Sequence, residues 1–445
     1  MIVDHRNVGA AFRRLSVPIA LQMVGDQTLG IVDTIVIGSL GAVALAGATA
    51  ANVTFLVIAF SAFGLMSGTS IVAAQRIGAN DIDGFALTVR SGALVPFVCG
   101  IVYLALALVC AKPIIHLLVG PLASADASAI YLVLRCASVV PIAISGTLIV
   151  GLAAAGNRII GVLVLLTINL VHIPLLLVLA LGWGTHHPYG IVGAGISSLL
   201  SEVLGMVCAL VYVSLQPAYR IFARVRVSIA EALRCARIGL PESVFLVGVM
   251  LPDVAIVAML SPLGPTIVAA FRALNIASDL TLALPIPLQQ ATQTVIGQRL
   301  GAGDVAGARW FLKRAQRFGT LVSTAGGVVA AACAWPLAFA FTLNATVATL
   351  AALPLALHMI TLPLKAWAMV SLAPIRAAGD TQFSMGIGLA CSALVIPFAW
   401  LGIERLHIGL YAIPLGWIAA WVVRAVWTQI KLRDADWTRR PGLAA

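Results

Sequence analysis

Long apolar runs follow one another along the chain, separated by short polar segments. About 20 apolar residues in a helix are enough to cross the hydrocarbon core of a bilayer. Twelve such runs lie at 16–38, 44–73, 91–111, 130–152, 159–182, 190–215, 238–260, 266–296, 319–342, 347–372, 383–402 and 408–430. The pattern predicts an all-α integral membrane protein with twelve transmembrane helices.

The second half of the chain repeats the first half at one constant shift, which carries Pro18 onto Pro241. At this shift "QRIGANDIDG" (75–84) falls on "QRLGAGDVAG" (298–307) without a gap. Matches held at one shift over so long a stretch are not expected by chance. We therefore predict two six-helix lobes.

The even number of spans in each lobe determines its symmetry. Six spans return the chain to its starting side, so both lobes enter the membrane in the same sense, and their pseudo-twofold axis should run along the membrane normal. We predict an N-terminal lobe at 1–215, a basic connector at 216–237 and a C-terminal lobe at 238–445. The connector should form an amphipathic cytoplasmic helix, and the substrate path should lie between the lobes.

The composition excludes a soluble protein. Hydrophobic residues make up 61% of the chain and charged residues 10%, with a mean hydropathy of +1.06, whereas soluble domains carry about 25% charged residues. A net charge of +11 would suit nucleic acid, but the basic residues fall between the apolar runs. We therefore expect membrane lipid as a partner and no nucleic acid.

Lysine and arginine positions predict the orientation. With the N-terminus inside, 22 of the 27 basic residues fall in inside segments, and only Lys112 and Arg405 fall in outside loops. The positive-inside rule then places both termini in the cytoplasm and the chain in the inner (plasma) membrane. The opening segment at 1–16 is too polar for a signal peptide, so the first helix should remain in the mature protein.

The chain shows no pattern for a cofactor, metal or nucleotide. Its seven cysteines form no CxxC pair, and the histidines of "GTHHPYG" (184–190) lack metal-site spacing. No Gly-Lys-Ser or Gly-Lys-Thr follows "GAGDVAG" (301–307), as a phosphate-binding loop would require. We expect no disulfide, no metal and no cofactor beyond a coupling ion, so an ion gradient would have to supply the energy.

Two carboxylates lie inside the first apolar run. Asp26 and Asp33 are seven residues apart, about two helical turns, so they share a face that Gln22 extends. A carboxylate at the bilayer centre costs about 2.5–3.5 kcal/mol, so this polar stripe should face the protein. The carboxyls could bond neighbouring helices and hold the bundle together, or they could gain and lose a proton on an ion path.

The second half carries its own polar set. Asp253 follows Pro252, which should kink its helix, while Arg272 and Asp279 share a face of the eighth span and Lys365 lies in the tenth. These charges could pair with one another. Alternatively, Asp253 or Asp279 could meet a cationic substrate or relay a second proton, within apolar walls that suit a lipophilic ligand.

Two stretches in the first half resemble the opening of the multidrug and toxic compound extrusion (MATE) family. They are "IVDTIVIGSLGAVALAGATAANV" (31–53) and "GTSIVAAQRIGAND" (68–81). The second half is similar to that family at "GLP" (239–241), "PLGPTIVAAF" (262–271) and "IRAAGDTQ" (375–382). The resemblance thus extends over essentially the whole chain.

The resemblance implies a cation site in the first lobe. In that family the acid of the first helix, which "VDT" places at Asp33, binds the coupling proton or sodium ion. An asparagine of the fifth helix matches Asn169, and a hydroxyl of the sixth helix matches Ser198. We include Asp26 in this cation-coupling set. Among the span histidines, which are commonly satisfied by hydrogen bonds alone, His172 is the best candidate for a role because it follows Asn169 by three residues.

This chain also departs from the family pattern. Many members carry a second acid where this chain has Ile173, and some carry a glutamate near the position of Val249. Sodium needs several hard oxygen ligands, as other such cations do. The missing acids therefore favour protons.

We predict a cation-coupled antiporter, with the proton as the favoured ion, that exports small lipophilic or cationic compounds by alternating access, and not an enzyme. The expected partners are a small-molecule substrate and membrane lipid, and we expect a monomer. A flippase for a lipid-linked saccharide is an alternative, but it would need a strongly cationic cavity, for which only Arg135, Arg272 and Lys365 are candidates against four acids within spans. An intramembrane enzyme is a further alternative, but it would need clustered acids near a membrane face.

Overall fold

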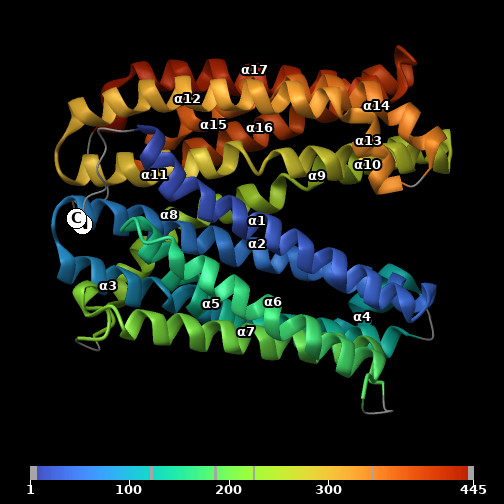
Figure 1. Cartoon of the computed structure of the whole chain (residues 1–445), viewed down its shortest axis with the longest axis horizontal. Helices are drawn as coiled ribbons and strands as arrows, with labels where there is room; N and C mark the ends of the chain where they lie inside the picture. The colour runs from blue at the N-terminus through green and yellow to red at the C-terminus, as the bar shows by residue number, and fades with distance from the viewer. Residues whose placement is uncertain (1–7, 121–123, 185–187, 224–225, 343, 439–445) are drawn as a thin grey trace. The chain divides into compact units, whose positions relative to one another are not determined.

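The computed structural model describes residues 8–120, 124–184, 188–223, 226–342 and 344–438, so His186 and His187 lie outside the described residues. The main helices are α1 (Val8–Ser39), α2 (Ala42–Gly78), α3 (Ile82–Gly92), α4 (Leu94–Val119), α5 (Ala125–Ala154), α6 (Ile159–Leu181), α7 (Gly190–Ser214), α8 (Ile229–Gly248), α9 (Leu251–Leu260), α10 (Pro265–Thr281), α11 (Pro285–Gly301), α12 (Val305–Ala332), α13 (Ala334–Thr342), α14 (Ala345–Ile360), α15 (Leu362–Ala377), α16 (Thr381–Trp400) and α17 (Ala412–Arg433) (Figure 1). Short helical turns η1 (Pro217–Tyr219), η2 (Ser261–Leu263), η3 (Leu401–Arg405), η4 (Gly409–Tyr411) and η5 (Ala435–Thr438) complete the list. The described part of the chain contains no strand, which confirms the all-α prediction.

Nine segments of the described chain are long and apolar enough to cross a membrane, and two bent helix pairs raise this number to eleven. The pairs are α12 with α13, bent by 63°, and α14 with α15, bent by 42°. The predicted span at 266–296 is instead divided into α10 and α11, each of 17 residues. The break falls directly before Pro285, which lacks a backbone N–H and therefore begins a helix more readily than it continues one.

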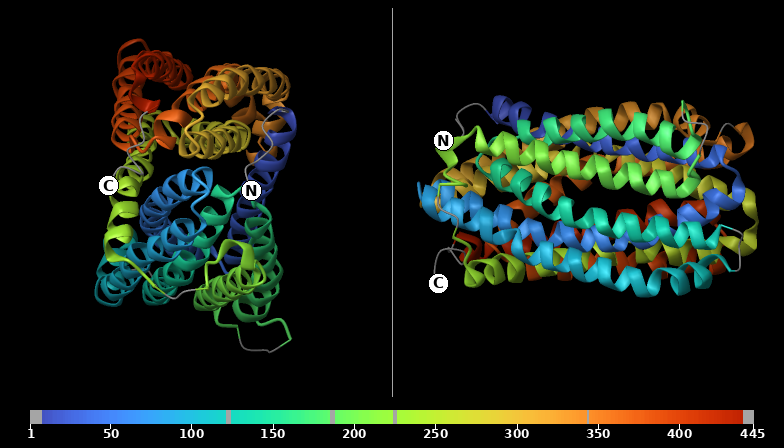
Figure 2. Two further views of the ribbon diagram at one scale, coloured as in Figure 1. Left: turned by 90° about the vertical axis from the view of Figure 1, so that its left-hand side faces the viewer. Right: turned by 90° about the horizontal axis from the view of Figure 1, so that it is seen from below.

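Contacts in space between residues divide the chain into two compact units. Among the described residues, unit 1 comprises Leu21–Ser243, and unit 2 comprises residues 8–20 and 244–438. Within each unit the helices run side by side along one direction (Figure 1 and Figure 2). In unit 1, α5 packs against α2, α4 and α7, and in unit 2, α15 packs against α11, α12 and α17.

The unit boundaries differ from the predicted lobes at the starts of α1 and α8. The first turns of α1 belong to unit 2, where Phe12 stacks on Phe318 with ring centroids 5.1 Å apart. The first turns of α8 belong to unit 1, where Thr88 donates a 2.6 Å hydrogen bond to Glu231. The two boundaries, after Ala20 and after Ser243, are related by the same shift that carries the first repeat onto the second.

In the described part of the predicted connector, residues 216–223 and 226–228 form no α-helix, and its last residues, from Ile229 onward, are the start of α8. After α7 the chain forms only η1, turns at Arg220 with a φ of 52°, and becomes helical again at Ile229. Arg90 of α3 holds this segment by donating to the carbonyl of Ile221 at 2.8 Å and to that of Arg226 at 3.2 Å. Backbone carbonyls of the connector are thus satisfied in part by the Arg90 side chain, and backbone N–H groups within 219–223 donate within the connector's own turns.

The repeat is visible in the backbone. Gly41 and Gly264 have φ of 111° and 104°, and Gly156 and Gly379 have φ of 86° and 93°. Glycine is favoured at these turns because residues with a side chain rarely adopt such a positive φ.

The same repeat appears at two helix starts. Asp81 caps α3 by accepting from a backbone N–H and pairs with Arg76 at 2.7 Å. Asp304 caps α12 in the same way and pairs with Arg299 at 2.6 Å. The two units therefore share local geometry at equivalent positions.

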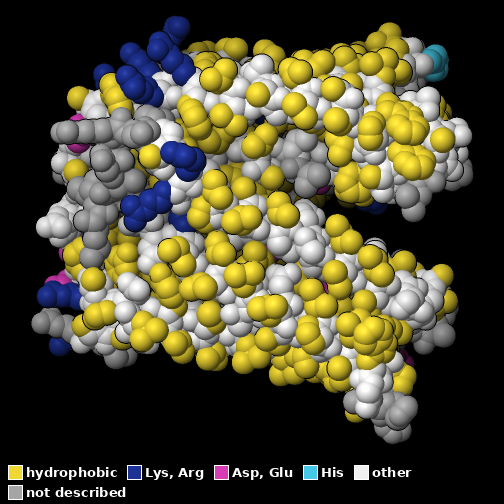
Figure 3. Space-filling model, in the orientation of Figure 1, with side chains coloured by type: hydrophobic (Ala, Val, Ile, Leu, Met, Phe, Trp, Pro, Cys, Tyr) yellow, Lys and Arg dark blue, Asp and Glu magenta, His cyan; other side chains and the backbone are white. Residues whose placement is uncertain are grey.

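The surface suits a bilayer. Figure 3 shows hydrophobic side chains over most of the visible face of each unit, with lysine and arginine gathered at one end of the helices. Large apolar side chains such as Leu108, Val109 and Leu170 are more than two-thirds exposed. Apolar surface of this extent is not found facing water in soluble proteins.

Glycines allow α2 and α8 of unit 1 to approach closely. Gly64 and Gly68 of α2 face Ser243, Gly239 and Cys235 of α8, and a Cβ built on either α2 glycine would fall inside van der Waals contact with the α8 backbone. Small residues four apart are a common way to bring membrane helices together. The start of α8 therefore depends on these glycines for its place in unit 1.

We expect Gly68→Ala to destabilise the protein by about 1–3 kcal/mol, because the added methyl group meets a rigid carbonyl. The measurement is the apparent Tm of the purified protein in detergent. Gly386→Ala is the matched control, since a Cβ at this α16 glycine meets nothing within 4 Å. Equal Tm values for the two variants would contradict the packing argument.

Candidate functional site

An acid and a base from two helices of unit 1 contact each other. Oδ1 of Asp33, on α1, lies 2.7 Å from Nε2 of His172, on α6. The His172 side chain is 1% exposed and that of Asp33 is 20% exposed. Asp33 is thus the accessible member of the pair and His172 the buried one. The partner of Asp33 is a titratable base and not an arginine or a lysine.

A serine completes the surroundings of the imidazole ring. Oγ of Ser201, on α7, lies 3.4 Å from Nδ1 of His172, and its hydroxyl donates to the carbonyl of Ser198 at 2.9 Å. Because the serine proton is engaged there, an oxygen lone pair is left for the ring. A doubly protonated ring can donate to both Asp33 and Ser201, whereas a neutral ring can donate to Asp33 alone. The site can therefore hold the imidazole with or without an extra proton.

The polar stripe of α1 reaches α6 at two levels. Gln22 lies so close to Gly161 of α6 that a Cβ on this glycine would clash with the amide. Two turns beyond Asp26, Asp33 meets His172 of the same helix. Asp26 itself is exposed on α1. The stripe therefore lines a face of α1 that contacts the rest of unit 1.

The other two predicted cation ligands bond to their own helices. Nδ2 of Asn169 donates to the carbonyl of Leu165 at 3.0 Å, and Oγ of Ser198 donates to the carbonyl of Ala194 at 3.0 Å. Short polar side chains inside helices commonly bond back in this way. Ser198 contributes to the site through its carbonyl, which fixes Ser201.

A further acid and a cation belong to the same region of unit 1. Glu202, next to Ser201 on α7, is within electrostatic reach of Arg135, Asp26 and His172. The guanidinium of Arg135 lies 3.9 Å from the ring centroid of Phe55, and its buried Nε has no hydrogen-bond partner among the described residues.

Glu202 is absent from the predicted set, as is Glu242 of α8. Both lie inside apolar runs of the sequence, so the criterion that selects Asp33 also selects them. With Glu202 included, the polar groups of units 1 and 2 contain five acids within spans instead of the four expected from the sequence, and Glu242 is not counted among them.

Unit 2 holds the second polar group. Nζ of Lys365, on α15, lies 2.6 Å from Nε2 of His358, on α14, and the same ring nitrogen contacts Oγ of Ser278, on α10. Asp279 acts on Lys365 electrostatically, and Asp253 acts on Asp279.

The remaining members of this group lie around Asp253. The side chain of Asn275 and the charge of Arg272 both act on the Asp253 carboxylate. The structure thus brings together Asp253, Asp279, Arg272 and Lys365, which the sequence places on separate stretches of the second half.

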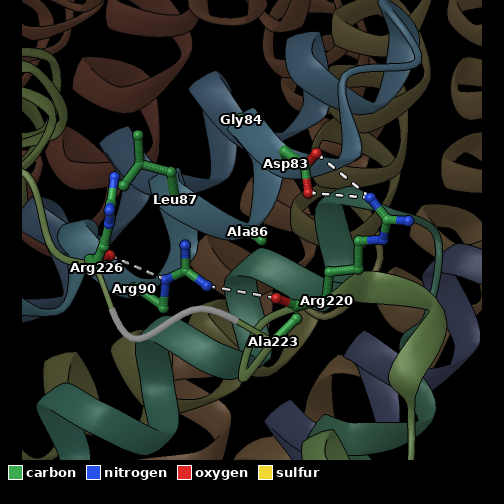
Figure 4. A pocket seen from close by; sticks show the side chains of 8 residues that line it. All are labelled: Asp83, Gly84, Ala86, Leu87, Arg90, Arg220, Ala223 and Arg226. Atoms are coloured by element: carbon green, nitrogen blue, oxygen red, sulfur yellow. Dashed lines mark hydrogen bonds and ion pairs between the residues drawn. The ribbon is translucent and has the colours of Figure 1, made fainter.

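A third polar group surrounds a cavity of 530 Å³ beside α3. Two of its three arginines have partners: Arg90 donates to connector carbonyls, and Arg220 donates to Asp83 at 3.3 Å (Figure 4). These contacts hold the connector in place. Among the described residues there is no group of three His, Cys, Asp or Glu that could hold a metal ion.

A model of the MatE family matches two segments of the chain, residues 18–178 and 241–401. The segments begin at Pro18 and Pro241, the two prolines that the sequence repeat aligns. The family therefore matches both halves in the same register.

Curated relatives agree with this match. The "Probable multidrug resistance protein NorM" of Idiomarina loihiensis is 31% identical over 150 residues, or 34% of this chain and 32% of that protein. The protein of the same name from Pseudomonas putida is 26% identical over 412 residues, or 88% of this chain and 87% of that protein.

Among solved structures, one described as the outward-facing conformation of a multidrug resistance MATE family transporter has a TM-score of 0.86, at 19% identity over 96% of this chain and 97% of that chain. A MOP superfamily transporter from Pyrococcus furiosus has a TM-score of 0.86, at 20% identity over 96% of each chain. At these identities the likeness shows the fold. Because the family model matches both repeats and most of the chain, the chain belongs to the MatE family.

Proposed function

We propose that this protein is a proton-coupled antiporter that exports small lipophilic or cationic compounds across the inner membrane by alternating access. In this proposal it acts as a monomer with both termini in the cytoplasm, and it is not an enzyme. Two observations support the general class: membership of the MatE family and relatives that are named multidrug resistance proteins. The observation that supports coupling of transport to protons is the contact between Asp33 and His172.

In this proposal the pair exchanges one proton for one substrate. With an imidazolium ring and a carboxylate the pair is neutral overall, and after loss of one proton it carries one negative charge. At an effective dielectric constant near 20, a cation 4 Å from such a charge gains about 4 kcal/mol. Proton and cation therefore compete for the same charge, and this competition is the basis of antiport.

The site is a better match for a proton than for sodium. Sodium would need several oxygen ligands, as hard cations generally do. Asn169 and Ser198 use their side chains within their own helices, and the direct partner of Asp33 is a nitrogen base. Glu202 is within electrostatic reach of His172 and of Asp26, so these two acids, when ionised, would add negative charge that attracts a cationic substrate.

The energy scale of one exchange is modest. One proton exchanged for one monovalent cation moves no net charge, so only the pH difference drives it. Each pH unit then supports about tenfold accumulation, or about 1.4 kcal/mol.

We expect Asp33→Asn to lower the ethidium accumulation reached under a pH difference of one unit at least tenfold, because an amide can neither bind a proton nor attract a cation. The assay is ethidium transport in proteoliposomes under an imposed pH gradient or an imposed sodium gradient. The control is Asp126→Asn, since the Asp126 side chain is 73% exposed at the start of α5. Wild-type efflux by the Asp33 variant, or sodium-driven efflux by the wild type, would refute the proposal.

We expect His172→Gln to slow efflux at least tenfold while the Kd for ethidium changes little. The glutamine amide can still donate to Asp33, but it cannot take a proton. Fluorescence titration gives the Kd, and the proteoliposome assay gives the rate. His116→Gln, at the exposed end of α4, is the matched control. An unchanged rate for His172→Gln would remove the histidine from the coupling step.

A further inference from the structure

Lys365 is a buried cation without an acid in direct contact. Its side chain belongs to a residue that is 2% exposed, within the bent pair formed by α14 and α15. Among the described residues no carboxylate lies within 4.0 Å of Nζ, and Asp279 acts on it only from a longer distance. Its direct partner is the ring of His358, which is 3% exposed.

The geometry limits this pair to one proton between its two nitrogens. At 2.6 Å, Nζ of Lys365 and Nε2 of His358 must share a hydrogen bond. Either an ammonium donates to a bare ring nitrogen, or a protonated ring nitrogen donates to a neutral amine. Protonation of both would set two positive charges at the same short distance, and their repulsion would break the contact.

The imidazole is only partly satisfied in this arrangement. Ser278 contacts the same Nε2, whereas the buried Nδ1 has no hydrogen-bond partner among the described residues. Buried polar atoms without a partner are rare and are often found at functional positions. The ring can therefore change its protonation without losing a bond at Nδ1.

The pair lies across a break in a membrane span. α14 ends at Ile360 and α15 begins at Leu362, with a bend of 42° between them. His358 precedes the break and Lys365 follows it. The hydrogen bond between their side chains therefore joins α14 to α15. Broken helices in transporters commonly surround sites where ions bind.

The acid that acts on this pair is itself accessible. The Asp279 side chain, on α10, is exposed, whereas Lys365 and His358 are buried. α10 packs against α14, and its Asp279 is the acid whose charge acts on Lys365. Farther out, Asp253 of α9 acts on Asp279, and Arg272 of α10 acts on Asp253. Loss of a proton from Lys365 leaves the Asp279 carboxylate without a counter-charge, and a cation could then take that place.

We propose that Lys365, His358 and Asp279 form a second proton-exchange centre in unit 2, so that the transporter exchanges two protons for each monovalent cation. The proton is held between Nζ of Lys365 and Nε2 of His358 and leaves through Asp279 to water. This inference rests on the proposed antiport, but its proton is counted separately from that of Asp33. Two protons for one cation move a net charge, so transport responds to the membrane potential.

The first test counts protons in the purified full-length protein. In weakly buffered detergent solution with a pH indicator, saturating ethidium should release two protons per wild-type molecule. Lys365→Met and His358→Gln should each release one, as should Asp33→Asn. Lys365→Arg should also release one, because a guanidinium keeps its proton while keeping the charge. The control Lys431→Met, at the partly exposed end of α17, should release two.

The second test measures electrogenicity in proteoliposomes at zero pH difference, with the potential set by potassium and valinomycin. The wild type should move ethidium in response to the potential alone, whereas Lys365→Arg should need a pH gradient. Size-exclusion profiles check folding. If the Lys365 variants misfold, His358→Gln is used in their place in both tests.

The outcomes separate the two proposals. Release of two protons by all Lys365 and His358 variants, with potential-driven transport retained, would overturn the second centre. Release of two protons by Asp33→Asn, together with release of one by Lys365→Arg, would instead overturn the role of Asp33 and leave the second centre standing.

Discussion

The interior of a bilayer offers no hydrogen bonds to a side chain, and this constraint determines how both units arrange their charges. In unit 1, the buried ring of His172 meets the more accessible carboxylate of Asp33. In unit 2, the buried amine of Lys365 meets His358 and lies within the field of the exposed Asp279. Each unit thus combines a buried nitrogen base with an accessible acid. In the proposed mechanism, a proton would enter from water at the acid and stop at the buried base, where lipid cannot solvate it.

The repeat preserves the backbone more strictly than the chemistry. Turn glycines and capped helix starts recur at the shift of the repeat, because a left-handed turn or an unsatisfied helix end is costly wherever it occurs. The polar residues do not follow this rule. Asp33 corresponds to Ile256 at that shift, and Arg135 corresponds to His358. The two units therefore use one scaffold for two different polar clusters.

Features set by local physics could be predicted from the sequence. Spans follow from apolar length, the repeat follows from identity at one shift, and Asp33 stands out because a carboxylate in an apolar run is costly. Pro285 alone would predict the break that precedes it, since proline disfavours continuation of a helix. A count of apolar runs misses this break because the residues on both sides are apolar.

Features set by packing between helices could not be predicted. The contact of Asp33 with His172 depends on the register of α1 against α6, and no periodicity within one helix determines that register. Asn169 and Ser198 look like cation ligands in the sequence, but each can also bond back to its own helix, and only coordinates distinguish these outcomes. The start of α8 belongs to unit 1 because glycines of α2 admit its backbone, which a lobe boundary drawn from apolar runs does not anticipate.

The two proposed proton sites would have the same effect on charge although their chemistry differs. Loss of a proton takes the Asp33 pair from neutral to negative, and it does the same to the group of Lys365, His358 and Asp279. Either change favours a cation, so both sites would drive the same exchange. With one site, a pH difference of one unit supports about tenfold accumulation, and with two it supports about a hundredfold. The second proton also makes the exchange electrogenic, which adds about 2.3 kcal/mol for each 100 mV of membrane potential. A second buried base thus increases the driving force without any change in the site that binds the first proton.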